Sequence, residues 1–164
     1  MSDDTMFAVP KDRQAVTVRL DKGGLLEGEI FLEPVPGSLS LHHKVTAFLE
    51  NNDLFFPIRL TVSGTTEFIN KKRVRFIEID FPGGPAEDYF SVQTMQSFPV
   101  IALCTDGSGV TGELLAEAPQ EKARLSDCLN LPNTFLCMKT DEKMRYINKE
   151  ALQKVVYKDK AKPR

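Results

Sequence analysis

The sequence contains no tryptophan, two histidines, three cysteines and three tyrosines among its 164 residues. It also has no excess of charge of either sign, because 21 Lys and Arg stand against 23 Asp and Glu. Nucleic-acid-binding modules usually carry a basic excess, so a role on RNA or DNA would depend on a local patch. No apolar run approaches the ~20 residues that a membrane-spanning helix needs, and the acidic start lacks the basic and then apolar order of a signal peptide.

The scarce cysteines and histidines also limit the chemistry that can be expected. Cys104, Cys128 and Cys137 form no CxxC pair, and each stands beside a leucine, which favours small buried hydrophobes over nucleophiles. Free buried thiols are typical of a reducing compartment, so we expect a soluble cytoplasmic protein. His42 and His43 have no third and fourth ligand at zinc-site spacing. We therefore expect them in a surface loop, and we expect no metal and no cofactor.

The chain repeats itself. Three blocks recur in the same order, and the register changes only between the blocks, where the first copy has longer loops. Repeats of this kind usually indicate an internal duplication of a supersecondary unit. The paired blocks are Val16–Glu33 with Val100–Glu117, Lys44–Arg59 with Arg124–Lys139, and Phe68–Ile79 with Tyr146–Tyr157, the last pair sharing Ile-Asn-Lys.

Each copy carries the pattern of five strands. Val16, Val18 and Leu20 alternate as in a half-buried strand and precede a hairpin-type turn, with equivalents near Val100. Gly28 and Gly112 fall inside the second strand, where glycine marks a bulge or a bend. The later strands are expected at 55–60, 67–69 and 74–79, and at 135–139, 143–147 and 152–157.

Two further features complete each copy. Apolar residues at helical spacing, beginning at Val45 and Leu125, predict a short helical turn that Thr46 or Ser126 can cap. Asn70 and Asn148 predict tight turns, since asparagine tolerates the left-handed conformation.

These elements predict a mainly β protein. We expect two tandem five-stranded barrels related by internal duplication, because a closed barrel removes the exposed edge strands. The expected organisation is a flexible N-terminus at 1–13, the first barrel at 14–80, a linker with an apolar packing segment at 81–97, the second barrel at 98–157, and a flexible basic tail at 158–164. Both units should have the same strand order.

A five-stranded unit that opens V-x-V-x-L-x-x-G, bends at a glycine and ends I-N-K-x-x-V-x-x-I resembles the Sm-like (LSm) variety of SH3-like barrel. Asparagine-lysine stands where that family often has arginine-glycine. The family's D-x-x-M-N signature, which contacts RNA, has a counterpart only in Asp127–Asn130. The run from Arg124 to Asn130 is also similar to bacterial proteins of unknown function. The resemblance implies a barrel fold, association of barrels edge to edge, and RNA as one class of ligand.

One basic cluster could bind RNA phosphates. It consists of Lys71, Lys72, Arg73 and Arg75, with His43 and Lys44 as further candidates. The preferred interpretation is a solvated turn beside a strand edge protected by charge, since natural sheets defend their edges in this way. The second copy, with Lys149, Glu150 and Ala151, has no such excess.

The sequence shows no phosphate-binding loop, nucleotide fingerprint, catalytic carboxylate pair or catalytic triad. We therefore expect a non-enzymatic interaction or assembly module that acts through a protein partner or through self-association, as a homodimer or small closed ring. The alternative is an RNA-binding Sm-like protein that uses the basic turn of the first copy. A minor alternative is an enzyme with a site between the two barrels.

Overall fold

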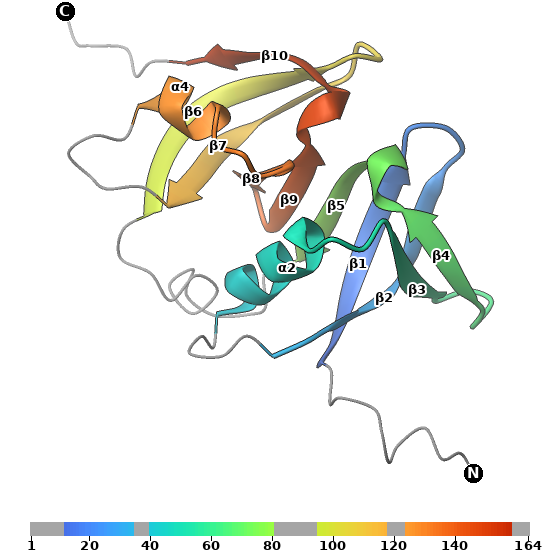
Figure 1. The fold of residues 1–164 in the computed structure, drawn as a ribbon. Coiled ribbons are helices and arrows are strands. Elements are labelled where there is room, and N and C mark those ends of the chain that lie inside the picture. Colours follow the sequence, from blue (N-terminus) through green and yellow to red (C-terminus); the bar gives the residue numbers. More distant parts are fainter. Residues whose placement is uncertain (1–11, 35–39, 81–94, 118–123, 159–164) are drawn as a thin grey trace, which may run out of the picture.

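The computed structural model describes residues 12–34, 40–80, 95–117 and 124–158. Within these ranges the protein is mainly β (Figure 1). Residues 12–80 form a first half with strands β1 (Asp12–Leu20), β2 (Leu25–Leu32), β3 (Phe55–Leu60), β4 (Thr66–Asn70) and β5 (Val74–Asp80), helix α2 (Leu41–Glu50) and the 3₁₀ turn η1 (Lys71–Arg73). Residues 95–158 form a second half with β6 (Met95–Cys104), β7 (Gly109–Glu117), β8 (Phe135–Thr140), β9 (Lys143–Asn148), β10 (Leu152–Tyr157), α4 (Leu125–Leu129) and η3 (Lys149–Ala151). No helix in the described ranges is both long enough and apolar enough to span a membrane.

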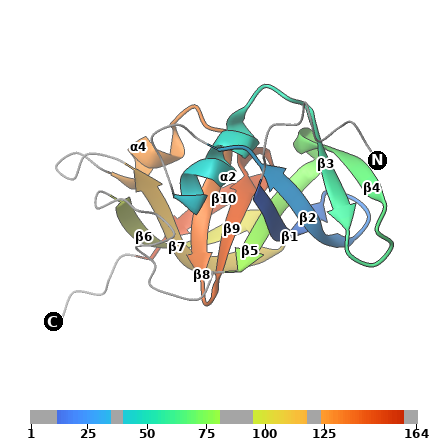
Figure 2. The same cartoon turned by 90° about the horizontal axis from the view of Figure 1, so that it is seen from below.

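All ten of these strands belong to one antiparallel sheet. Its order is β10-β6-β7-β8-β9-β5-β1-β2-β3-β4, so the halves have orders that correspond position by position, as the repeat predicts. Figure 2 shows β8, β9, β5 and β1 side by side where the halves meet. The sheet is not closed, and two separate barrels are therefore not shown. The fifth strand of the first half pairs with β9 of the second half instead of with the fourth strand of its own half.

The two halves also share an irregularity. The pairing of β5 with β1 skips Arg75, between Val74 opposite Leu20 and Phe76 opposite Arg19. In the second half, the pairing of β10 with β6 skips Gln153 at the equivalent place. An extra residue in one strand bends the ladder and increases its twist. The same bend therefore occurs in each half.

Burial follows the alternation of the sequence. Val16 and Val18 in β1 are buried, as expected for a strand with one face on a core. One apolar cluster gathers residues from β1 to β5 and α2 together with Phe135, Cys137, Met144 and Tyr146 from β8 and β9. A second cluster lies within the second half around Val100, Leu114 and Met138. The first core therefore extends across the meeting point of the two halves.

The helices differ from their predicted form. α2 has ten residues rather than one turn, and the hydroxyl of Ser40 caps it by accepting a hydrogen bond from the His43 amide. Thr46 lies inside this helix and Ser126 lies inside α4, so the prediction that they cap first turns was wrong. The N-cap of α4 is Arg124, which makes no capping side-chain bond.

The segment boundaries shift by a few residues. β1 begins at Asp12, inside the predicted flexible N-terminus, and β6 begins at Met95, inside the predicted linker. The Lys158 amide, in the predicted tail, donates to the Pro99 carbonyl. The remaining parts of these three segments, including the apolar packing segment before Met95, lie outside the described residues.

Gly28 and Gly112 mark close approaches between strands. A Cβ at Gly28 would lie less than 3.0 Å from the Arg59 carbonyl oxygen of β3, and a Cβ at Gly112 would lie equally close to the Lys139 carbonyl oxygen of β8. Any side chain would push the neighbouring backbone away. The structure therefore shows close approaches of neighbouring strands at these two glycines, where the sequence predicts a bulge or a bend.

We expect Gly28→Ala and Gly112→Ala each to lower the free energy of unfolding by about 1–3 kcal/mol, because overpacking against the backbone strains the sheet. Gly24→Ala is the matched control, since a Cβ there meets nothing within 4 Å. Urea unfolding measured by circular dichroism checks this. Equal midpoints for all three variants would contradict the close approach.

Candidate functional site

The pairing of β5 with β9 is the interface between the two halves. Five residue pairs are in register, from Phe76 opposite Ile147 to Asp80 opposite Lys143. We call this contact the internal junction. Its main-chain ladder continues the sheet from one half into the other.

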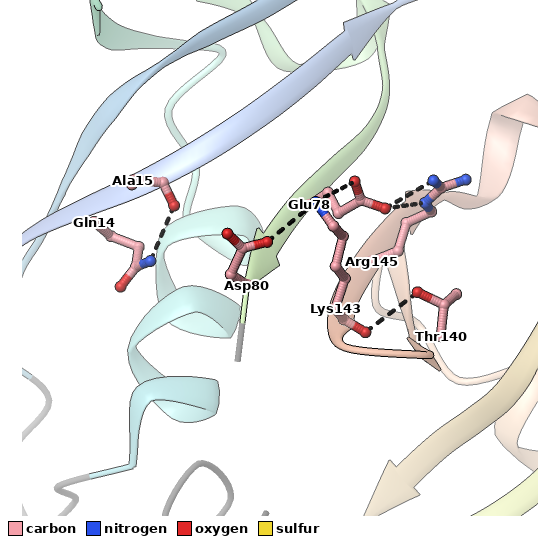
Figure 3. A network of polar contacts seen from close by, with 7 residues as sticks. All are labelled: Gln14, Ala15, Glu78, Asp80, Thr140, Lys143 and Arg145. Atoms are coloured by element: carbon pink, nitrogen blue, oxygen red, sulfur yellow. Dashed lines mark hydrogen bonds and ion pairs between the residues drawn. The ribbon is translucent and has the colours of Figure 1, made fainter. Parts of the chain in front are cut away.

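A charge network covers one face of the internal junction (Figure 3). The Glu78 carboxylate accepts from both the Nε and a terminal nitrogen of Arg145, at 2.9 and 2.7 Å. Lys143 lies 3.8 Å from Glu78 and 3.1 Å from Asp80, and this raises the pKa of the Lys143 ammonium. The Arg145 guanidinium also lies 4.0 Å from the ring centroid of Phe76, a residue diagonal to it in the ladder. Opposite charges therefore support this register on the face of the sheet that lies away from the first apolar cluster, where Phe76 and Ile147 pack in the second cluster.

The sequence analysis did not identify Glu78, Lys143 or Arg145. One signal was available, because Val74, Phe76, Ile77 and Ile79 break the alternation expected for a strand with one buried face. Such a break indicates contacts on both faces. The charge of Glu78 is complementary to those of Lys143 and Arg145. This indicates a contact only when β5 and β9 are known to pair.

Asn148 closes the end of the internal junction. Its side-chain oxygen accepts from the Glu150 amide and so caps η3, while its amide nitrogen donates to the Val74 carbonyl across the junction, at 2.9 Å. Asn70 caps η1 in the same way through the Lys72 amide. The predicted tight turns are present as η1 and η3, but both asparagines have extended backbone conformations, so the left-handed conformation expected of them was wrong. Their role is side-chain capping.

On the core-facing side, α2 lies against the second half. The Nδ1 atom of His42 lies 2.9 Å from the Tyr146 hydroxyl, and both side chains are buried. The Glu50 carboxylate accepts from the amides of Thr134 and Phe135. The prediction of a surface loop for His42 was wrong, because the periodicity of α2 turns that residue toward β9.

A cavity of about 300 Å³ lies beside this contact. His42, Glu50, Cys137 and Tyr146 are among the residues that line it. Burial raises the pKa of the Cys137 thiol well above its usual range, which disfavours the nucleophilic thiolate. His42 and Glu50 are engaged in the bonds described above. In the described part of the chain, no group of three His, Cys, Asp or Glu could hold a metal ion.

The basic cluster of the sequence is divided by the fold. Lys71 is buried, and its ammonium donates to the Phe48 carbonyl at 2.9 Å and to the Asn51 side chain at 2.6 Å. Burial lowers the pKa of Lys71. Lys149 makes equivalent bonds to the Leu131 carbonyl and the Asn133 side chain. The lysine of each Ile-Asn-Lys run thus ties its turn to the loop that follows the helix.

The other candidate cations do not lie together, and three of them pair with acidic side chains. Arg73 lies 3.5 Å from Asp21, and Lys44 lies 2.7 Å from Asp12. Arg75 is buried and donates to Asp106, which lowers the pKa of that carboxyl and raises the pKa of the guanidinium. His43 lies in α2 and is partly buried, and Lys72 is exposed. The predicted nucleic-acid residues therefore do not form one continuous free patch.

Among the described residues, no strand pairs with the outer edge of β4 in the first half or of β10 in the second half, and we call these the open edges of the sheet. Exposed apolar side chains gather there: Phe68 in β4, Phe55 in the adjacent β3, and Val156 and Tyr157 in β10. An open edge with apolar side chains is a site where another strand can pair. Comparison of the chain with protein-family models, curated proteins and solved structures gives no match.

The two neighbouring lysines of η1 provide a direct test of the structural role of Lys71, which is buried and hydrogen-bonded to the end of α2. We expect Lys71→Met to lower the free energy of unfolding by about 1–3 kcal/mol, because carbonyls near the end of α2 lose a charged donor. Lys72→Met, the matched control at an exposed position, should stay within about 0.5 kcal/mol of the parent protein. Urea unfolding checks this. Equal destabilisation by both changes would show that burial does not distinguish the two lysines.

Proposed function

We propose that the protein is a non-enzymatic interaction and assembly module that binds protein strands at the open edges of its sheet. Its two halves are, in this proposal, Sm-like barrel units related by duplication. The proposal includes a cytoplasmic location, because thiols such as those of Cys128 and Cys137 remain free in reducing compartments.

The internal junction carries this proposal. It joins a fourth strand, β9, to a fifth strand, β5, and leaves the other fourth strand and the other fifth strand open. Strand addition is a general mode of protein recognition, in which the main chain supplies affinity and side chains on alternate positions supply specificity. The exposed apolar residues of β4 and β10 suit that mode.

The other candidate functions have less support. An RNA-binding surface would need cations that are free to meet phosphates, whereas Lys71 is buried and Arg75 is paired. An enzyme that uses the cavity beside α2 would need an activated nucleophile or base, whereas burial opposes ionisation of Cys137. RNA binding remains an outcome of the tests below.

The proposal predicts that edge substitutions abolish partner binding. Tagged protein in a nuclease-treated lysate should retain defined protein partners. Phe68→Asp combined with Tyr157→Asp should lose them, because an unpaired charge would be buried in the added strand. Val62→Asp is the matched control, since Val62 is apolar and exposed but lies in the turn between β3 and β4. Partners that survive the edge substitutions, or that disappear with nuclease alone, would overturn the proposal.

A second measurement addresses RNA. We expect the purified protein to bind single-stranded RNA poorly at physiological salt, since Lys71 is buried and Lys44, Arg73 and Arg75 are paired with acidic side chains. Fluorescence anisotropy with labelled RNA at several salt concentrations checks this. Tight binding that weakens steeply with salt, and that Lys72→Ala with Arg73→Ala reduces, would support the RNA-binding alternative.

A further inference from the structure

A cavity of about 150 Å³ lies against the face of the internal junction that is turned away from the first apolar cluster. Strands β1 and β5 of the first half line it together with β9 and the β6–β7 hairpin of the second half. The cavity therefore depends on both halves. Its charged lining residues are Arg19, Arg75, Arg145 and Asp106.

The bulge in β5 directs Arg75 into this cavity. Neighbouring residues of a regular strand point to opposite faces of the sheet, yet Arg75 and Phe76 both line the cavity. The pairing of β5 with β1 skips Arg75, and a bulge can redirect a side chain in this way. The Arg75 side chain is only 10% exposed, whereas its counterpart Gln153 is exposed. The first half thus holds a guanidinium where the second half has a solvated amide.

Arg75 retains hydrogen-bond donors that the protein does not use. A guanidinium carries five N–H groups, and among the described residues only one terminal nitrogen of Arg75 makes a hydrogen bond, to Asp106. No buried side-chain nitrogen or oxygen in the described ranges lacks a hydrogen-bond partner. The other two nitrogens of Arg75 are therefore in contact with solvent and can donate to a ligand.

Positive charge exceeds negative charge around the cavity. Asp106 pairs with Arg75. Arg145 pairs with Glu78, which does not line the cavity (Figure 3). Arg19 is exposed and forms no ion pair within the described part of the chain. Because a cleft lined by an excess of one charge concentrates ions of the opposite sign, the cavity favours an anion.

The repeat shows that the fold does not require these charges. The blocks that align the two copies place Leu103 at the position of Arg19 and Gln153 at the position of Arg75. The second half keeps the bulge and the strand order without either guanidinium. The arginines therefore give this place a charge that the duplicated framework lacks.

We propose that this cavity binds a small oxyanion, a carboxylate or a phosphate group, whose oxygens accept hydrogen bonds from Arg19, Arg75 and Arg145. Guanidinium groups present paired N–H donors at the spacing of carboxylate and phosphate oxygens. They also keep their charge at every physiological pH. Three of them, contributed by three different strands, surround one site.

The size and the walls of the cavity limit the ligand. Liquid water occupies about 30 Å³ per molecule, so the cavity has room for about five waters. That volume admits inorganic phosphate or a small carboxylate and is too small for a nucleotide. Phe76, Val110 and Ile147 form an apolar wall that suits a ligand with a short apolar body. Such a ligand is not a protein strand, so this inference goes beyond the proposed function.

Cys104 reports on the cavity, because it lines the cavity and is partly exposed, whereas Cys128 and Cys137 are buried. Iodoacetate and iodoacetamide are alkylating agents of similar size, and only iodoacetate carries a carboxylate. We expect the ratio of their rates at Cys104, iodoacetate over iodoacetamide, to be about tenfold higher in the native protein than in urea-unfolded protein. Mass spectrometry of the labelled cysteine measures both rates. An equal ratio in the two states would overturn the inference.

Two exposed arginines of β1 distinguish the cavity from a general attraction to positive charge. Arg19→Gln should return most of the native ratio to the unfolded value, and Arg13→Gln, the matched control, should leave it unchanged. Both changes remove one positive charge, but Arg13 lies about 20 Å from Arg19 along the strand. Neither side chain is buried, so both variants should fold. Equal effects of the two changes would contradict a site at the cavity.

Competition identifies the oxyanion. Sodium phosphate and sodium benzoate are added at matched ionic strength, with sodium chloride as the reference. We expect at least one of them to slow alkylation of Cys104 by the neutral iodoacetamide, with saturation in the millimolar range or below, and Arg19→Gln to weaken that protection about tenfold. Protection by phosphate alone would assign the phosphate class, and protection by benzoate the carboxylate class. Protection by neither, or equal protection by chloride, would overturn the inference.

Discussion

Main-chain pairing between β5 and β9 is the contact on which the rest of the structure depends. It joins the strands of both halves into one sheet. It also places Tyr146 and Phe135 in the core of the first half and brings Glu78 to Arg145. The pairing uses the outer edge of a fifth strand, so β5 has a neighbouring strand on each side. Within the described residues, the sheet ends at β4 and β10.

Much of each half could be predicted from the sequence. The strands and the shared strand order follow from local alternation and from the repeated blocks. The joining of the halves could not be predicted in the same way, because β5 and β9 are distant in sequence and their pairing depends on tertiary geometry. The irregular apolar pattern of Ile77 and Ile79 indicated contacts on both faces without identifying the neighbour.

The Ile-Asn-Lys run shows where a local interpretation fails. Lys71, Lys72, Arg73 and Arg75 are adjacent cations in the sequence, and adjacency suggests a basic surface. The fold separates them, because the acceptors of Lys71 are Phe48 and Asn51, which precede it by about 20 residues. The sequence analysis predicted too short a helix at α2 for a similar reason. The cap at Ser40 lies before the apolar periodicity that begins at Val45, and His42 contacts a residue in the other half.

The internal junction has a consequence for synthesis on the ribosome. β5 is complete at Asp80, whereas β9 begins only at Lys143, so the first half emerges with its fifth strand lacking its neighbour. Tyr146 and Phe135, which complete the first core, also arrive late. Exposed apolar surface and unpaired strand edges make nascent chains prone to aggregation and attractive to chaperones. The nascent first half is therefore prone to aggregation until β9 pairs with β5 and the first core is complete.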